Sequence, residues 1–463
     1  MFPIPLTPFE ESFLVDDRSG SELDVLVRCR FAGRADRPRM EAAFRHALQR
    51  HPLLNAQVRR TRWGRYEWVG DPADAVTARL EWSDDRFPEP EFPPSQSIKA
   101  RDGIPTRLIV DVRDDHTSLV LHFHHTRADG AGTFQFLEDV LLHYANSERS
   151  MAPIEFPRLE PHRLPARNRF GLSAIGWLRK LPRLFVGLRG IRQFVSRQPV
   201  TLVAVSHDVN SPSAPDGRIV GCVDLSADET MALRAAAKRQ SVSLNDLLTR
   251  DNFLAIHDWR VERGAVRDDD WMRLMVPINM RRAEDRSIPA ANIVSTVYLD
   301  RRPVHCESPD ELLRSIHEEM ALIKDRDLGL IFSLTLRLAR MFPGGITRLT
   351  SNQQCVATAV FTNTMRPLDH WQLPREGGRL RAGNLLLENL DVYAPLRRNT
   401  LLTCAVLTYD DRLRICVRMD GRYLNLTDRD RFLVLLSKRL MASVGATGAA
   451  TPEAILAEGG GGR

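Results

Sequence analysis

A short run of histidines ends in an aspartate and a glycine, and residues of these types can move protons. The run is His124-His125-Thr126-Arg127-Ala128-Asp129-Gly130, and His122 lies two residues before it. Because side chains alternate along a strand, His122 and His124 share one face, while His125 lies on the other. An imidazole titrates near neutral pH, so a histidine at a strand end beside a glycine-bearing loop can act as a general base. The pattern predicts a histidine of this run as a candidate base, and only one of the two adjacent histidines can face a given site.

Two other interpretations of the run stay open at this point. Two histidines and an aspartate within six residues also occur by chance, without a chemical role. A metal site would use His122 and His124 as ligands from one strand face and Asp129 as a third. No other histidine or cysteine cluster offers a fourth ligand at a familiar spacing, so we expect no metal.

The elements that must position the run are predicted from residue periodicity. Alternating apolar residues predict a hairpin of Thr106 to Val112 and Ser118 to His125, and helical spacing follows from Thr133 to Tyr144. Residues 75 to 103, rich in Pro, Asp and Glu, predict a loop. Upstream, Asp36 and Pro38 open a helix. The expected buried face of that helix is Met40, Ala43, Phe44, Ala47 and Leu48.

A second group of elements begins near Asp208. Helices are expected after the capping residues Ser226, Ser243 and Ser308, and a last helix is expected with caps at Thr427 and Asp430. The predicted strands are Ile219 to Val223, Arg273 to Pro277, Cys355 to Thr362 and a hairpin within Leu401 to Met419. The tail 456–463 should be disordered.

Between these two groups, residues 161–207 form a predicted basic amphipathic linker. From His162 to His207 the chain has no acidic residue, while arginines alternate with Leu, Ile, Phe and Trp. Such a segment could contact an anionic membrane surface through 163–197, or it could be ordinary inter-lobe helices with an arginine-rich outer face. The second interpretation is favoured, because amphipathic helices of this kind usually pack on their own protein.

Several motifs resemble one superfamily in the expected order along nearly the whole chain. The first is His-His-x-x-x-Asp-Gly, shared by condensation domains of nonribosomal peptide synthetases, bacterial wax ester synthases, polyketide-associated acyltransferases and alcohol acetyltransferases. The Asp-Phe-Gly-Trp-Gly segment of the plant members is absent here. The other landmarks are Pro8-Phe9-Glu10 with Phe13-Leu14, Arg50-His51-Pro52-Leu53-Leu54, Ser243-Leu244-Asn245-Asp246, Val276-Pro277-Ile278-Asn279-Met280-Arg281 and Phe361-Thr362-Asn363.

The resemblance implies an α/β fold of two lobes like chloramphenicol acetyltransferase, each a mixed β-sheet flanked by helices, with an active-site tunnel between them. On this basis we expect an N-terminal lobe at 1–160 with the histidine motif, the linker at 161–207 and a C-terminal lobe at 208–455. A thioester donor would enter the tunnel at one mouth and the acceptor at the other, and they would meet at His125.

The resemblance also implies roles for individual residues. His125 would deprotonate an acceptor hydroxyl or amine, and Asp129 would be structural, paired with Arg281 of the second lobe. Gly130 would let its backbone approach the thioester and help to hold the oxyanion. His124 would support the site. Thr362 and Asn363 could line the tunnel or donate to the oxyanion, but forming a turn is an equal alternative. Asn245 and Asp246 could simply cap a helix, and Arg281 and Arg282 could be a solvated pair.

Composition limits the choice of compartment and partners. The chain of 463 residues has a formal net charge of +6, six scattered cysteines and no leader-like N-terminus. We therefore expect a cytoplasmic protein, peripheral at the inner membrane surface if the linker binds lipid. The positive balance suits acyl-coenzyme A or an acyl or peptidyl carrier protein as donor. With dispersed arginines and 7% aromatic residues, nucleic acid is not expected as a partner.

Three functions remain from these observations. The first is acyl transfer from a coenzyme A or carrier-protein thioester to an alcohol or amine, which needs no cofactor. The second is a wax ester or diacylglycerol synthase at a lipid surface. The third is a condensation-like module that only docks a carrier protein without catalysis.

Overall fold

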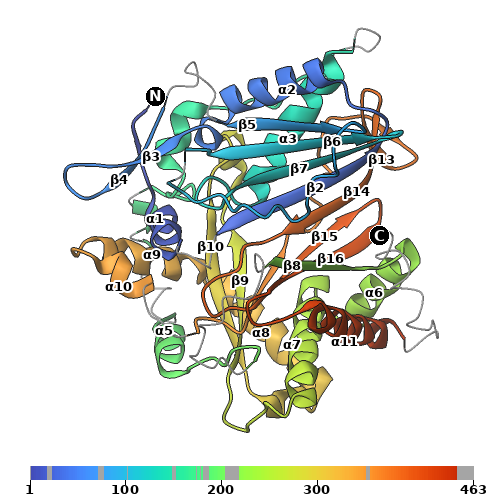
Figure 1. Ribbon diagram of the computed structural model, residues 1–463. Coiled ribbons are helices and arrows are strands. Elements are labelled where there is room, and N and C mark those ends of the chain that lie inside the picture. The colour runs from blue at the N-terminus through green and yellow to red at the C-terminus, as the bar shows by residue number, and fades with distance from the viewer. Residues whose placement is uncertain are drawn as a thin grey trace.

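The computed structural model describes residues 2–17, 23–70, 78–101, 103–148, 153–173, 175–177, 179–180, 187–203, 218–350 and 355–445. Two large mixed sheets face each other, each covered by helices on its outer side (Figure 1). The expected α/β architecture of two lobes is confirmed in these ranges. The predicted disordered tail 456–463 lies outside the described residues.

The first sheet has seven strands in the order β12-β13-β14-β2-β7-β6-β5. All neighbours pair antiparallel except β5 and β6, which are parallel. The predicted hairpin is β6 and β7, and its buried face packs against α2 and α3. The strands are β2 (Asp24–Ala32), β5 (Arg79–Asp84), β6 (Thr106–Arg113), β7 (His116–His124), β12 (Arg375–Glu376), β13 (Arg379–Ala382) and β14 (Leu385–Tyr393).

Helices α2 (Arg37–Arg50) and α3 (Gly130–Asn146) cover this sheet. Asp36 caps α2 through the amide of Arg39. The buried face predicted for the first of these helices is confirmed. The reason is local, because apolar residues three and four apart fall on one side of a helix and bury together.

The second sheet has six strands in the order β10-β9-β11-β15-β16-β8. It is mixed because β11 runs parallel to both β9 and β15. The strands are β8 (Arg218–Asp224), β9 (Met272–Asn279), β10 (Val294–Arg301), β11 (Ala359–Asn363), β15 (Leu402–Tyr409) and β16 (Arg412–Asp420). Its helices are α6 (Ala227–Arg239), α7 (Leu244–Glu262), α8 (Pro309–Asp325) and α11 (Leu426–Val444). The short turn η3 (Ala283–Ser287) follows β9, and η4 (Pro303–Cys306) follows β10.

Strands β12 to β14 correct the expected lobe boundaries. The expected C-terminal lobe includes residues 375–393. In the structure, however, β14 pairs with β2 of the first sheet, with Val392 opposite Val27. The apolar residues of β13 and β14 belong to the same hydrophobic core as those of α2 and α3. The core of the first lobe therefore needs residues from the C-terminal part of the chain. The chain therefore crosses back from the second lobe to close the edge of the first.

Two smaller predictions are also wrong. Within the expected loop 75–103, residues Arg79–Asp84 form β5, because their backbone pairs with β6 although their side chains are largely polar. The last helix is capped by Asn425 in a capping box with Asp428, not by Thr427 and Asp430. Strand pairing decides the first case, and in the second the Asn425 side chain takes the amide of Asp428.

A third, small sheet of β1 (Ile4–Pro5), β4 (Tyr66–Val69) and β3 (Gln57–Arg60) lies beside the first lobe. Helix α1 (Pro8–Asp16) follows β1 and contacts both α9 (Gly329–Arg340) and α10 (Gly345–Thr350). The turn η1 (Pro52–Leu54) leads into β3. In Figure 1 these elements project on one side of the molecule, and Phe13 of α1 stacks on His125.

The described part of the predicted linker contains η2 (Pro161–Ala166) and α5 (Gly187–Ser196). Several of its basic residues bind partners within the protein, as the favoured interpretation expects. Arg167 is buried and pairs with Glu10, Lys180 pairs with Asp327, and Arg197 lies over the ring of Trp271. Among the described residues no helix is long and apolar enough to cross a membrane.

Candidate active site

His125 follows the last residue of β7 and is fixed through both its backbone and its ring. Its amide donates to the carbonyl of Leu23 at 2.7 Å. Its Nδ1 lies 2.9 Å from the carbonyl oxygen of Ala128. A carbonyl can only accept, so Nδ1 carries the proton in this bond and Nε2 keeps a free lone pair. The ring is thus held in the tautomer that a base using Nε2 requires.

The surroundings of His125 keep the ring neutral. Burial lowers the pKa of His125 below its ordinary 6.5, and the bond to Ala128 and the charge of Asp129 oppose this only in part. The neutral, proton-accepting form is therefore the resting form at neutral pH.

Phe13 of α1 covers the imidazole. The two rings stack with centroids 4.7 Å apart and an interplanar angle of 24°. Helix α1 is held there by a capping box in which Thr7 and Glu10 bond each other's backbone amides. Glu10 is fully buried and also accepts from Arg167 and from the Trp68 indole. The landmark around Phe9 and Glu10 thus positions a ring against His125.

Asp129 caps α3 and reaches across to the second lobe. Its Oδ1 accepts from the amide of Gly132 at 2.9 Å. Its Oδ2 accepts from the amide of Ile293 at 2.8 Å and from Nη1 of Arg281 at 2.7 Å. The expected partner Arg281 therefore contacts Asp129 directly, while Arg282 is exposed. With these three donors the carboxylate is engaged on both of its oxygens.

Asn292 also contacts the histidine motif, although no sequence pattern marks it. Its side-chain amide donates to the carbonyl of His125 at 2.9 Å and to that of Thr126 at 2.8 Å. The same segment packs closely on α3, because a Cβ on Gly132 would meet the Ala291 nitrogen at 2.9 Å. The Asn itself offers no motif, and only the fold brings it to the histidine.

Arg127, inside the histidine motif, ties the turn to the first lobe. It is fully buried and donates to the carbonyls of Leu53 and Ala56. Burial lowers the pKa of its guanidinium to about 9. The landmark beginning at Arg50 thus contacts the motif through the carbonyl of Leu53. His51 of the same landmark accepts a hydrogen bond from the amide of Ala290 and bonds Asp139.

His122 and His124 do not form a metal site with Asp129. His122 bonds Asp24 at 2.7 Å, and Asp24 in turn pairs with Arg418 of the second sheet. His124 bonds Thr126 through Nδ1, and its Nε2 lies 3.5 Å from the Asp17 carboxylate. The face that these two histidines share is buried, and both rings are already engaged by these partners.

Among the described residues, one group of metal-type ligand atoms lies together, namely Cys222, Asp391 and Cys416. Arg28 and Arg414 already engage the Asp391 carboxylate at 2.6 and 2.8 Å. This acceptor is neutralised by guanidinium groups, so the donor set does not fit a resident cation.

Gly130 and the end of β11 meet between the lobes. Gly130 is the first residue of α3, and a Cβ there would lie 3.2 Å from the Thr364 methyl group. Asn363 accepts from the amide of Met365 and donates to Asn245. The side chain of Asn363 is therefore used in a turn and a helix contact, which favours the turn alternative. Thr362 is half-buried on the same strand end.

Two cavities of about 300 and 280 Å³ open elsewhere on the protein. The first is lined by Trp82 and Arg107, the second by Arg366 and Thr408, and neither is lined by His125. The stacked Phe13 ring occupies the space beside the imidazole. The expected tunnel through His125 stays a prediction.

Sequence comparison finds distant relatives. No protein-family model matches the chain. Two proteins of Mycobacterium tuberculosis, described as uncharacterized proteins MT2362 and Rv2305, are each 27% identical over 287 residues. The match covers 60% of this chain and 61% of each relative, so it spans less than two thirds of their length.

Solved structures match almost the whole chain. The starter condensation domain of rhizomide synthetase RzmA, in complex with C8-CoA and Leu-SNAC, is 14% identical with a TM-score of 0.67, covering 96% of this chain and 95% of that one. The first condensation domain of the calcium-dependent antibiotic synthetase is 15% identical with a TM-score of 0.67, covering 98% of both chains. This chain has the condensation-domain fold.

The condensation-domain fold also occurs with another chemistry. The epimerization domain of tyrocidine synthetase B matches with a TM-score of 0.66 and 15% identity, covering 96% of both chains. A likeness at this identity gives the fold, and the chemistry has to be argued from the residues around His125.

Proposed function

We propose that this protein is an acyltransferase that moves an acyl group from a coenzyme A or carrier-protein thioester to an alcohol or amine. The observation that carries the proposal is the bond from His125 Nδ1 to the Ala128 carbonyl. It leaves Nε2 as a proton acceptor at a strand end, and burial lowers the pKa of the ring so that it is neutral.

The reaction follows from that base. Nε2 of His125 takes the proton from the acceptor's O–H or N–H while the acceptor atom attacks the thioester carbonyl carbon. The tetrahedral intermediate then expels the thiolate, which receives the proton from the imidazolium and leaves as a thiol. Base catalysis of this kind is typically worth about 10²–10⁴-fold in rate. No cofactor takes part in these steps.

Gly130 supports the charge that develops on the carbonyl oxygen. It opens α3, and the first amides of a helix have no partner within that helix. Asp129 takes the amide of Gly132, and the Gly130 amide, at the first position of the helix, is the candidate oxyanion donor. Asp129 is engaged with Arg281, so its role here is to position the loop and not to act as a second base.

A wax ester or diacylglycerol synthase acting at a lipid surface is the second candidate. It is favoured by the large apolar residues Ile175, Ile191 and Val195, which are exposed among arginines in the 161–207 segment. Activity with long-chain alcohols would separate this function from transfer to small acceptors.

The experiment measures thiol release from short-chain and long-chain acyl-coenzyme A and from acyl carrier protein, with alcohol and amine acceptors. Wild type is compared with His125→Ala and with the control His116→Ala, which changes an exposed histidine at the other end of β7. Acceptor-dependent release that disappears only in His125→Ala supports the proposal. Release that persists in that variant overturns the role of His125. Silence of the wild type with every donor would favour a non-catalytic docking module.

A further inference from the structure

About half of the exposed large apolar side chains lie on one side of the protein. Of the fifteen exposed large hydrophobic residues among those described, eight lie on three segments. The segments are the β3–β4 hairpin, the described part of 161–207 and the α9–α10 pair. We call their joint surface the apolar-cationic face, and its apolar members are Trp63, Ile175, Ile191, Val195, Leu338, Met341, Phe342 and Leu349.

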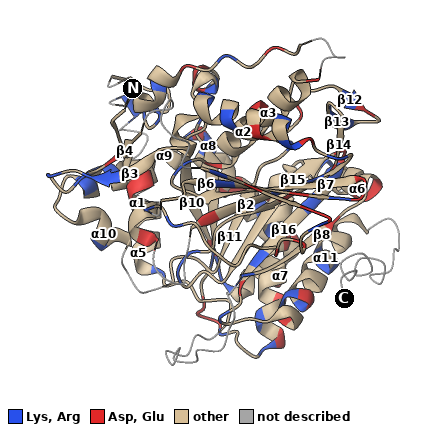
Figure 2. Cartoon of the chain, turned by 45° about the horizontal axis from the view of Figure 1, so that its top comes forward, with Lys and Arg blue, Asp and Glu red and all other residues tan. Residues whose placement is uncertain are grey.

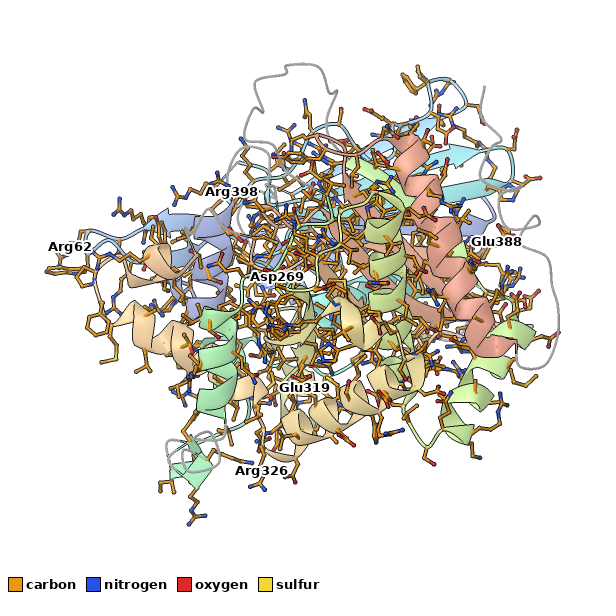
Figure 3. All side chains as sticks on the ribbon, turned by 90° about the horizontal axis from the view of Figure 1, so that it is seen from below. Arg62, Asp269, Glu319, Arg326, Glu388 and Arg398 are labelled. Atoms are coloured by element: carbon orange, nitrogen blue, oxygen red, sulfur yellow. The ribbon has the colours of Figure 1, made fainter. Side chains whose placement is uncertain are left out.

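The three segments are neighbours in space. Arg337 of α9 lies over the Trp177 ring at 4.4 Å and donates to the carbonyl of Asn168. Residues of the hairpin, of α9 and of the 161–207 segment share one small apolar core, which includes Trp68, Leu172 and Leu330. The hairpin tip, with Arg62 at its end, and the α9–α10 pair project on the same side in Figures 1 and 3.

The charge of this face is mainly positive, and the acidic residues at its edge, Glu67 and Asp327, are paired with Arg59 and Lys180. The ranges 56–66, 162–203 and 328–350 contain no Asp or Glu, and Lys and Arg colour the β3–β4 hairpin in Figure 2. Trp63 is 77% exposed at the hairpin tip with Arg62 over its ring, and Met341 and Phe342 are 74% and 66% exposed. The exposed arginines that surround them are Arg60, Arg62, Arg65, Arg179, Arg192 and Arg348.

We infer that the apolar-cationic face docks the protein on an anionic lipid bilayer. Arginines attract anionic headgroups, and exposed Trp, Phe, Met and Leu side chains between them insert at the headgroup boundary. Charge complementarity selects this occupant. A second copy of the chain would bring the arginines of two such faces together, and like-charge repulsion opposes that arrangement.

A row of aromatic rings runs from this face to the candidate base. Phe13 stacks on His125, Phe9 meets Phe13 edge-on at 4.7 Å, and Phe332 of α9 meets Phe9 at 6.0 Å. Phe9 and Phe332 are partly exposed, and Phe332 belongs to α9, which also carries Leu338 of this face. If the proposed function holds, a hydrophobic acyl chain or alcohol from the bilayer has an apolar surface along which to approach His125.

The test is co-sedimentation of the full chain with vesicles of phosphatidylcholine alone and with vesicles that also contain phosphatidylglycerol. Binding is expected on the anionic vesicles and should weaken as salt is raised. The variants Arg60→Glu/Arg62→Glu and Met341→Glu/Phe342→Glu should each lower the binding constant about tenfold or more. The matched control is Met231→Glu/Val304→Glu, which changes residues of similar exposure on α6 and η4 and should bind like wild type.

Three results would overturn the inference. They are no binding of the wild type to anionic vesicles, an equal loss in the control variant, or a vesicle-free dimer that only the Met341→Glu/Phe342→Glu variant dissociates in sedimentation velocity. The vesicle measurement needs no enzymatic turnover. Its outcome is therefore separate from that of the thiol-release assay, and a bilayer-binding protein without acyl transfer would still be recognised.

Discussion

Asp129 and Arg281 lie 152 residues apart in the chain, yet Oδ2 of one and Nη1 of the other are 2.7 Å apart. Their side chains are only 6% and 11% exposed, and the pair joins the loop after β7 to the loop after β9. The same carboxylate caps α3, so the two lobes and the histidine motif share one ionic contact.

Replacing Arg281 should destabilise the protein and disorder the motif. Arg281→Ala leaves a buried carboxylate without its cation, and breaking such a pair costs about 3 kcal/mol. Urea unfolding would measure this loss. Arg282→Ala, at the exposed neighbouring position, should change the free energy of unfolding by less than about 0.5 kcal/mol. Equal losses in the two variants would contradict the role given to the ion pair.

The pH dependence of turnover should follow the pKa of His125. Burial lowers the pKa of His125 below 6.5, so the basic form persists at mildly acidic pH. The rate, as kcat/KM, should therefore be constant near neutrality and fall as pH drops through a value below 6.5. His122→Gln, which changes a histidine bonded to Asp24, should leave that pH unchanged. A midpoint above 6.5 would show that another group controls the rate.

Stability should change with pH in the same direction. Burial lowers the pKa values of both His122 and His125 in the folded protein, so the unfolded chain binds more protons. The contribution of these two groups is fully present above their unfolded pKa and is lost as pH falls through the folded values. The free energy of unfolding, measured by urea titration at several pH values, should decrease below about pH 6.5. The loss should be smaller in a His122→Gln variant.

Local patterns predicted much of the fold. Alternation predicted β6 and β7, and helical spacing predicted the buried face of α2, because both depend on residues close in the chain. The return of β12 to β14 to the first sheet could not be predicted this way. Alternating apolar residues show that a strand is half-buried, but they do not show which sheet edge it joins.

Only those residues of the candidate site that lie in a recognisable motif could be predicted from the sequence. His125, Asp129 and Arg281 came from the resemblance, and in the structure Asp129 bonds Arg281 while its charge acts on the His125 ring. Asn292 was missed because it lies 167 residues from the His125 carbonyl that it bonds, and a single asparagine has no pattern. For Asn363 the sequence left two alternatives, and its bonds to Met365 and Asn245 favour the turn.

Asn292 should act as a positioning residue for the histidine loop. Asn292→Ala removes two donors to buried carbonyls, which should lower the free energy of unfolding by about 1–3 kcal/mol. Asn292→Asp places a carboxylate against the carbonyls of His125 and Thr126, so its loss should be larger and should grow as pH rises. Urea unfolding across pH would measure both. A stable Asn292→Asp variant would contradict the two hydrogen bonds.

Phe13 should control both the packing and the pKa of the base. Phe13→Ala removes a buried ring and should cost about 3–5 kcal/mol in unfolding free energy, while Phe13→Leu keeps most of the volume and should cost less than about 1.5 kcal/mol. Because the ring stacks on the imidazole at 4.7 Å, its loss lets water reach His125. The desolvation that lowers the pKa of His125 then weakens, so the acidic fall in kcat/KM should move to higher pH in Phe13→Ala. An unchanged midpoint in a folded Phe13→Ala variant would mean that the ring only fills space.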